Sequence, residues 1–340
     1  MFKKLNQIEM NMNPSDILKW HLILKYGLKE PFLSRNQHSD IVYLGPTLKL
    51  NQTYTLIELS LEGANQISLD CLSKLVDNNR EIHVLDFKKD VQKIIKKLKK
   101  KHKDFDDVIY YQQVLTVLSS KGIEGLNWSD TFNKNQKSFA VIPNILLPYL
   151  ELISKLDTLI RSKKEVMIAI DGDAASGKTT LSKRIKSLFE ANLFHIDDFF
   201  QKPTVDPSDP HSKFGSNIDF NRLIDQVITP IKNKDKISYQ AMDHQTHQLM
   251  SPSIIKYKPV NIIEGSFSMH PKLIDVYDYK IFLTIGRYKQ KMRIIHRNGF
   301  SSWMKFKRRW IPNEKRYFNG LRIKEQANDV LNTNHLKRLD

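Results

Sequence analysis

Short apolar runs alternate with amphipathic segments in the part of the chain beyond residue 164. The runs typical of buried strands are Val166–Ile170, Leu193–Ile196, Val260–Ile263 and Tyr279–Ile285. Helical spacing of apolar residues predicts helices at Thr180–Phe189, Asp219–Ile228 and Arg287–Arg297, with Asp219 as a helix N-cap. Alternation at this spacing predicts an α/β fold in which helices flank both faces of a parallel sheet.

The pattern before residue 143 is mixed. Helical spacing occurs in Ser15–Tyr26, Lys88–Lys103 and Val108–Leu118, and strand-like runs occur in Thr53–Leu59 and Glu81–Phe87. His83, His102 and Cys71 lack the spacing of metal ligands, and no catalytic constellation is visible there. We therefore expect a mixed α/β accessory domain at 1–142, a connecting helix within 143–164 and the sheet domain at 165–340.

A complete phosphate-binding loop (P-loop) lies between the first strand and the first helix of the sheet domain. It comprises Gly172, Asp173, Ala174, Ala175, Ser176, Gly177, Lys178 and Thr179, followed by Thr180. Glycines let successive backbone N–H groups surround phosphate oxygens, and the helix N-terminus adds partial positive charge. Lys178 can reach the terminal phosphates and Thr179 can hold Mg²⁺. The loop therefore predicts ATP and Mg²⁺ as cofactors.

Two other classes of P-loop protein are disfavoured. A GTPase would carry Asn-Lys-x-Asp after a strand, whereas the acid in Asn233-Lys234-Asp235-Lys236 comes one position early and follows no predicted strand. No longer module typical of a helicase or transporter motor is visible in the sequence.

The net charge adds one alternative partner. Lys and Arg outnumber Asp and Glu by 54 to 37 among 340 residues, a net charge of +17. Such a charge attracts anions, including nucleotide phosphates and nucleic acid. The basic block Lys88–Lys103 fits an amphipathic helix with a solvated lysine face, or a surface that touches nucleic acid or anionic lipid. Nucleic acid is thus an open but disfavoured partner.

Cysteine usage and hydropathy bear on location. The single cysteine, Cys71, excludes an intramolecular disulfide and fits a reducing cytosol. Residues 1–20 lack the apolar core of a secretory signal, and no apolar run approaches the about 18 residues that a membrane span needs. The sequence therefore predicts a cytoplasmic protein without a membrane partner.

Acidic side chains follow two of the predicted strands. Asp197 and Asp198 come directly after Leu193–Ile196, and Glu264 comes directly after Val260–Ile263. Ligands of parallel α/β sheets bind outside the carboxyl ends of the strands. There, one carboxylate can accept the proton of an acceptor hydroxyl while another supports Mg²⁺. The alternatives are a capping role for the Asp197–Asp198 pair and a salt bridge for Glu264.

Four separated motifs resemble the uridine kinase family, a family of P-loop nucleoside kinases, in its bacterial form. They are Ile170–Thr180, His195–Phe200, Ile263–Pro271, and Arg297–Gly299 followed by Arg309–Glu314 and Tyr317-Phe318. The resemblance covers roughly residues 165–335 and makes the sheet domain a P-loop kinase domain, whereas residues 1–142 resemble no family that we can name.

The resemblance implies roles for several of these residues. Asp197 would be the general base for the 5′-hydroxyl of a ribonucleoside, and Glu264 would assist Mg²⁺ or the acceptor. Arginines after residue 287 would form a lid over the phosphates. Arg293 and Arg297 are the leading candidates, because they lie four residues apart on one helical face. Each arginine can equally be a solvated surface residue, as can Arg308, Arg309 and Arg316.

Recognition of the acceptor involves three further candidates. By the same resemblance, Tyr239 and His244 would contact a pyrimidine base, after a short strand at Lys236–Tyr239. The alternative is that Tyr239 packs in the sheet and His244 is solvated. Asp219 either binds ribose hydroxyls or does no more than cap its helix.

These observations favour an ATP- and Mg²⁺-dependent kinase that phosphorylates the 5′-hydroxyl of uridine or cytidine. The same P-loop and carboxylates would also serve nicotinamide riboside, pantothenate or ribulose phosphate as acceptors. A nucleotide-regulated nucleic-acid-binding protein is the alternative of another class, and a polynucleotide 5′-kinase is disfavoured. The expected partner is a small-molecule nucleoside, and assembly into a homo-oligomer stays open.

Overall fold

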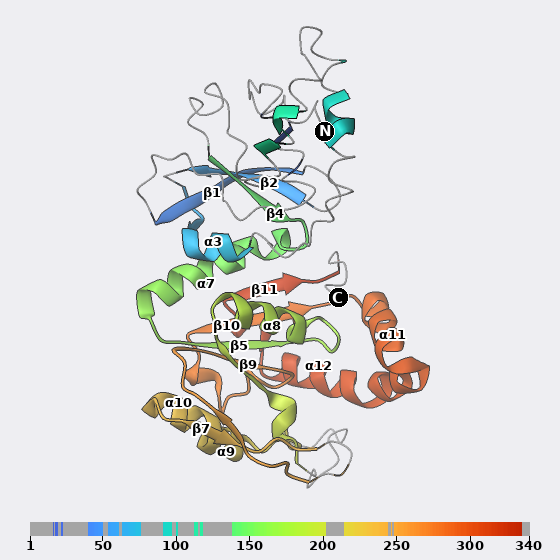
Figure 1. Ribbon diagram of the computed structural model, residues 1–340. Helices are drawn as coiled ribbons and strands as arrows, with labels where there is room; N and C mark the ends of the chain where they lie inside the picture. Colours follow the sequence, from blue (N-terminus) through green and yellow to red (C-terminus); the bar gives the residue numbers. More distant parts are fainter. Residues whose placement is uncertain are drawn as a thin grey trace. The chain divides into compact units, whose positions relative to one another are not determined.

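The computed structural model describes most of the chain from residue 138 onward and parts of the chain before it. The described residues are 16, 18–19, 22, 40–49, 54–60, 63–75, 91–96, 100, 112–114, 116–117, 138–201, 214–243, 246 and 248–334. The chain divides into two compact units, residues 1–158 and 159–340. The division falls within helix α7 (Leu150–Lys163), which follows a 3₁₀ turn at Leu147–Tyr149 (Figure 1).

The N-terminal unit contains an antiparallel sheet. Its strands are β1 (Ile41–Lys49), β2 (Tyr54–Ser60), β3 (Gln66–Ser68) and β4 (Ser138–Pro143), in the order β3-β1-β2-β4. Helix α3 (Leu69–Leu75) follows β3 directly. Val42, Ile57, Ile67 and Leu72 are fully buried and form part of the apolar core of this unit.

The elements predicted for this unit are seen in part. The strand expected at Thr53–Leu59 is confirmed as β2, while β1, β3 and β4 were not predicted. The described residues within Ser15–Tyr26, Lys88–Lys103 and Val108–Leu118 are helical. The strand expected at Glu81–Phe87 lies outside the described residues.

The C-terminal unit is built on a parallel sheet of five strands. These are β5 (Val166–Gly172), β6 (Asn192–His195), β9 (Val260–Glu264), β10 (Tyr279–Thr284) and β11 (Asp329–Asn332). Their order is β11-β10-β5-β9-β6, and every neighbouring pair is parallel. The sheet confirms the predicted fold class and the four predicted strands. The edge strand β11 was not predicted, because only Val330 and Leu331 of its four residues are apolar.

Helices and turns connect and flank these strands. They are α8 (Lys178–Leu188), η4 (Ile196–Phe199), α9 (Phe220–Leu223), η5 (Ile224–Ile228), α10 (Thr229–Asn233), η6 (Ile274–Val276), α11 (Arg287–Lys305), η7 (Phe306–Trp310), α12 (Ile311–Gly320) and η8 (Lys324–Gln326). A small antiparallel pair, β7 (Ile237–Tyr239) and β8 (Ser253–Ile255), lies between α10 and β9. The described residues include no helix that is long and apolar enough to cross a membrane.

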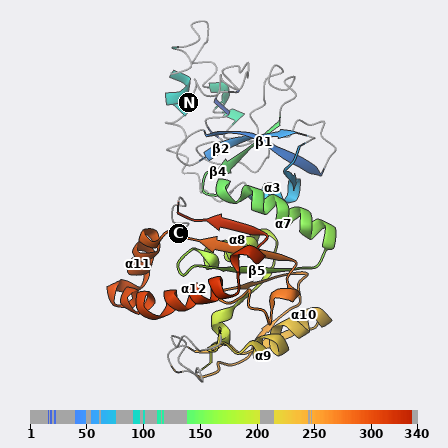
Figure 2. The same ribbon diagram turned by 180° about the vertical axis from the view of Figure 1, so that it is seen from behind.

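Successive side chains of a strand point to opposite faces of the sheet, and in this sheet each face packs against other elements. Ala169, Ile263 and Phe282 pack in one apolar cluster with residues of α9 and with Tyr317 and Phe318 of α12 (Figure 2). Helix α8 contacts β5, β6 and β9 through its own buried face. The carboxyl ends of all five strands therefore open at one edge, where the P-loop begins.

Two of the predicted helices are present with a different extent. The helix expected at Asp219–Ile228 is the short α9 continued by η5. The predicted Asp219 cap is confirmed, because its carboxylate accepts the Arg222 N–H at 3.0 Å at the start of α9. Helix α11 extends past Arg297 to Lys305 and is interrupted at Gly299, whose φ of 82° is not helical. This left-handed residue redirects the segment that leads to α12.

Candidate active site

The P-loop joins the central strand β5 to helix α8, and two glycines shape it. Gly172 has a φ of 134°, and a Cβ there would lie 2.1 Å from the carbonyl oxygen of Leu283. Gly177 has a φ of 100° at the N-cap of α8, and a Cβ there would meet nothing within 4 Å. Gly172 thus allows close approach to β10, while Gly177 turns the backbone beside open space.

The loop is fastened to the end of β10. The Asp173 N–H donates to the Leu283 carbonyl at 2.9 Å, and the Asp173 carboxylate accepts the Ile285 N–H at 3.0 Å. The Nζ of Lys178 donates to the carbonyls of Gly172 at 2.8 Å and Asp173 at 3.1 Å. The side chain of Lys178 therefore folds back on the loop, and its ammonium group lies beside the loop backbone at the N-terminus of α8. This arrangement fits a polyphosphate chain, which needs inward amides and a nearby cation.

Helices α11 and α12 also hold the P-loop. The Ala174 N–H donates to Glu314 of α12 at 3.0 Å, and the Ala174 carbonyl accepts Gln290 of α11 at 3.0 Å. Arg293 donates to the Ala175 carbonyl at 3.2 Å and to the Thr333 carbonyl at 3.0 Å. Arg293 therefore contacts the loop backbone in this structure.

Arg297 lies one turn further along α11. Its side chain is exposed, and its Nε donates to the neighbouring Asn298 at 2.7 Å. The role of Arg293 and Arg297 at the transferring phosphoryl group stays a prediction.

Two buried carboxylates join helix α12 to the P-loop and the sheet. Glu314 also accepts the Ser266 hydroxyl at 2.6 Å, and burial raises the pKa of Glu314 to about 7. Asp171, the last residue before the loop, accepts the Tyr317 hydroxyl at 2.9 Å and the Met269 N–H at 3.0 Å. Burial raises the pKa of Asp171 to about 6. Both groups sit where an ionised carboxylate is costly, so their hydrogen bonds are needed to hold them.

Glu264 lies at the tip of β9, next to the P-loop strand. One of its oxygens accepts the Thr179 hydroxyl at 2.9 Å and lies 2.5 Å from His195 Nδ1. The hydrogen bond to Glu264 is the main reason why the pKa of His195 is raised. Thr179 and Glu264 thus bring two oxygen groups to one point, as Mg²⁺ bound mainly by phosphates and waters requires. Among the described residues, no group of three or more His, Cys, Asp or Glu could hold a metal by itself.

Asp197 and Asp198 lie one strand further from the P-loop. Their turn, η4, follows β6, which pairs with β9 so that His195 stands opposite Glu264. Asp197 is exposed, and Asp198 is half-buried and accepts the Tyr239 hydroxyl at 3.2 Å. His195 is the residue of β6 that pairs with Glu264 of β9. Asp197 therefore lies two residues beyond this pair, just after the end of β6.

Of the two residues expected to contact the base of the acceptor, the structure describes Tyr239 but not His244. The Tyr239 ring is buried between Phe199, with ring centroids 5.6 Å apart, and Phe194 at 5.7 Å. Burial and the neighbouring Asp198 raise the pKa of Tyr239 to about 12. His244 lies outside the described residues. The contacts of Tyr239 to a base, like those of Asp219 to ribose, stay predictions.

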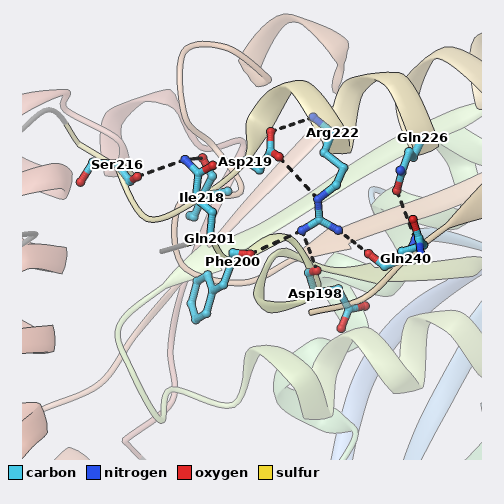
Figure 3. Close-up of polar contacts among 9 residues, drawn as sticks. All are labelled: Asp198, Phe200, Gln201, Ser216, Ile218, Asp219, Arg222, Gln226 and Gln240. Atoms are coloured by element: carbon cyan, nitrogen blue, oxygen red, sulfur yellow. Dashed lines mark hydrogen bonds and ion pairs between the residues drawn. The ribbon is translucent and has the colours of Figure 1, made fainter. Parts of the chain in front are cut away.

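Arg222 joins the segments that carry Asp198, Asp219 and Gln240, as Figure 3 shows. It donates to the carbonyls of Asp198 and Gln240, and its Nε lies 3.6 Å from a carboxylate oxygen of Asp219. Its side chain is only 10% exposed, and burial lowers the pKa of its guanidinium.

The sequence assigned no role to Arg222, Glu314 or Asp171, although Asp171 and Glu314 lie in motifs that resemble uridine kinases. A local signal existed for Glu314, because it lies one helical turn before Tyr317 and so shares its buried face. No local signal marks the carbonyl partners of Arg222, since they lie 18 to 24 residues away in the chain.

The comparisons with known proteins bear on the C-terminal unit. The nicotinamide riboside kinase of Saccharomyces cerevisiae is 45% identical over 174 residues, which cover 44% of this chain and 71% of the yeast protein. No family model matches the chain.

Two solved structures are also similar. A structure described as a possible uridine kinase from Bacillus stearothermophilus has a TM-score of 0.39 and 18% identity, covering 53% of this chain and 99% of that one. An uncharacterized protein from Eubacterium ventriosum has a TM-score of 0.31 and 11% identity, covering 51% of this chain and 91% of that one.

Proposed function

Because this chain belongs to the family of P-loop kinases that includes uridine kinase and nicotinamide riboside kinase, we propose that it phosphorylates the 5′-hydroxyl of a ribonucleoside with ATP and Mg²⁺. The observation that carries this proposal is the contact of Thr179 with Glu264 beside the P-loop. Asp197 follows on the adjacent strand tip. A phosphate cradle, a metal-supporting pair and a carboxylate for the acceptor hydroxyl are the parts that phosphoryl transfer needs.

Each residue has a distinct task in this proposal. Lys178 leaves its carbonyl partners to neutralise the β- and γ-phosphates, and Thr179 and Glu264 hold Mg²⁺. When held there, Mg²⁺ would supply positive charge to the phosphates. Asp197 accepts the proton of the 5′-hydroxyl, and Asp219 binds ribose hydroxyls. Arg297 joins the phosphates when the lid closes.

Nicotinamide riboside is the acceptor to test first. The yeast relative carries that activity in its name and shares 45% identity over the aligned residues. In addition, the acceptor-side segments 196–201, 217–222 and 237–243 hold four carboxylates, from Asp197, Asp198, Asp219 and Asp243, against the one guanidinium of Arg222. An excess of negative charge favours a cationic ring such as the pyridinium of nicotinamide riboside over a neutral base.

Uridine and cytidine form the second candidate class. Their support is the set of sequence motifs that resemble uridine kinases, above all His195–Phe200 and Ile263–Pro271. A pyrimidine is neutral, so its recognition would depend on hydrogen bonds and stacking rather than on charge.

The deciding experiment is transfer of labelled phosphate from ATP to a panel of acceptors. The panel holds nicotinamide riboside, uridine, cytidine, pantothenate and ribulose phosphate, and the Lys178→Ala variant controls for contaminating kinases. We expect product from nicotinamide riboside at a higher kcat/KM than from uridine or cytidine. The reverse order would overturn the acceptor assignment alone. Transfer to no ribonucleoside would overturn the proposed function.

A further inference from the structure

Arg222 is an unusual residue for a charged side chain, because most of its partners are uncharged. Its two terminal nitrogens donate to the Gln240 carbonyl, to the Asp198 carbonyl at 3.1 Å and to the Phe200 carbonyl at 3.5 Å. The guanidinium carbon also lies 4.8 Å from the centre of the Phe199 ring. Asp219 is the carboxylate partner that these contacts include. The guanidinium thus serves three backbone carbonyls rather than an anionic ligand.

These carbonyls belong to separate segments that Arg222 joins, as the dashed lines in Figure 3 show. Asp198 and Phe200 lie in and just after the η4 turn, which also carries Asp197. Gln240 directly follows Tyr239 at the end of β7. Arg222 itself lies on α9. One planar group therefore ties together the three segments that bear the acceptor candidates.

Backbone hydrogen bonds join the same segments as Arg222 does. The Met242 N–H donates to the Asp198 carbonyl at 2.8 Å, and the Asp219 N–H donates to the Phe199 carbonyl at 2.8 Å. The Gln201 amide adds bonds to the carbonyls of Ser216 at 3.2 Å and Ile218 at 3.3 Å. The η4 turn is thus held along its length, and Arg222 supplies its only charged donor among the contacts described for this turn.

The shape of the group matters as much as its charge. A guanidinium presents five N–H donors in a rigid plane, so it can satisfy diverging acceptors at once. A lysine ammonium has the same charge on a flexible stem and cannot reproduce that fork. Removing the fork takes one donor away from each of three half-buried carbonyls. The Asp198 carbonyl keeps the Met242 N–H, but the turn loses its side-chain tie to α9 and is freer to move.

We propose that Arg222 is a positioning residue of the acceptor site, which fixes the turn bearing Asp197 relative to α9 and to the segment that follows Tyr239. This inference rests on the proposed function. A displacement of about 1 Å in a reacting group can cost about 10²-fold in rate, so loss of the fork should affect transfer to the acceptor far more than ATP binding.

The test compares Arg222→Lys and Arg222→Gln with wild type and with Arg184→Lys, a control on α8 at a half-buried position. For the best acceptor of the panel, we expect kcat/KM to fall by about 10²-fold in both Arg222 variants. The Kd for ATP, measured by calorimetry, should stay within about twofold. Arg184→Lys should match wild type. An Arg222→Lys variant with wild-type kcat/KM would show that only charge matters and would overturn the proposal.

Hydrogen exchange followed by mass spectrometry gives a second readout that needs no activity. We expect faster exchange in peptides covering residues 196–201 and 237–243 of Arg222→Lys, with unchanged exchange in residues 178–188 of α8. Unchanged exchange in the first two peptides, or equally faster exchange in all three, would overturn the positioning role. A wild-type protein inactive on every ribonucleoside would instead overturn the proposed function, while the exchange result would still report on Arg222.

Discussion

The buried carboxylate of Glu314 makes a quantitative prediction about stability and pH. Burial raises the pKa of Glu314 from 4.5 to about 7, despite hydrogen bonds from Ser266 and Ala174 and the nearby charge of Lys178. The unfolded chain releases this proton near pH 4.5 and the folded chain near pH 7. The folded state therefore binds more protons between these values, and stability is lost as pH rises from about 4.5 through about 7.

The size of this loss of stability follows from the difference between the two pKa values of Glu314. Each tenfold change in a protonation equilibrium corresponds to about 1.4 kcal/mol, so the full loss above pH 7 is about 3 kcal/mol. Glu314→Gln removes the titration but keeps the shape. Its amide oxygen can accept the Ala174 N–H, and its NH₂ can donate to the Ser266 hydroxyl. The variant should therefore lack this part of the pH dependence.

Urea unfolding at pH 5 and pH 8, followed by tryptophan fluorescence, measures this difference. From pH 5 to pH 8, the stability of Glu314→Gln relative to wild type should rise by about 2 to 3 kcal/mol, because part of the full loss has already occurred at pH 5. Subtracting the two proteins cancels the groups that titrate in both. Glu325→Gln, at an exposed position just after α12, is the matched control and should show no such change. A relative stability of Glu314→Gln that is the same at both pH values would refute the reasoning.

Three further predictions concern the catalytic groups and the loop. Asp197→Asn should lower kcat by about 10² to 10⁴ while ATP still binds, as expected for loss of a general base; activity within threefold of wild type in a steady-state assay would assign the proton to another group. Lys178→Ala should lower kcat by about 10²-fold or more, because positive charge leaves the transferring phosphate; an unchanged kcat would refute the P-loop assignment. Gly172→Ala should lower the Tm far more than Gly177→Ala, because its Cβ would lie 2.1 Å from the Leu283 carbonyl oxygen, whereas at Gly177 only backbone strain arises; similar melting shifts would contradict this distinction.

Local patterns in the sequence determined much of the C-terminal unit. The four apolar runs from Val166 onward became strands of the parallel sheet, and the P-loop sequence gave the strand, glycine turn and helix that it predicts. The Asp219 cap was readable for the same reason, since a cap depends on residues within one helical turn. Such features are set by neighbours in the chain, so a single sequence contains them.

The N-terminal unit was harder to predict. Its strands β1, β3 and β4 show no clear alternation in the sequence, and β1 pairs with β2 through a register shift between Leu44 and Thr47. Antiparallel pairing of β2 with β4 joins residues about eighty positions apart. Nothing in local spacing specifies such a pairing.

Only the tertiary structure decided how the candidate site is assembled. Strand order places β9 between β5 and β6, so Glu264 meets Thr179 while Asp197 lies one strand away. Folding also buries Glu314 against the P-loop and lets Arg222 gather carbonyls from three segments. These contacts arise because distant parts of the chain must bury apolar surface together and then satisfy the polar groups trapped with it. The spacing of apolar residues shows which face of each element must be buried. Which partners the trapped polar groups find depends on which elements become neighbours.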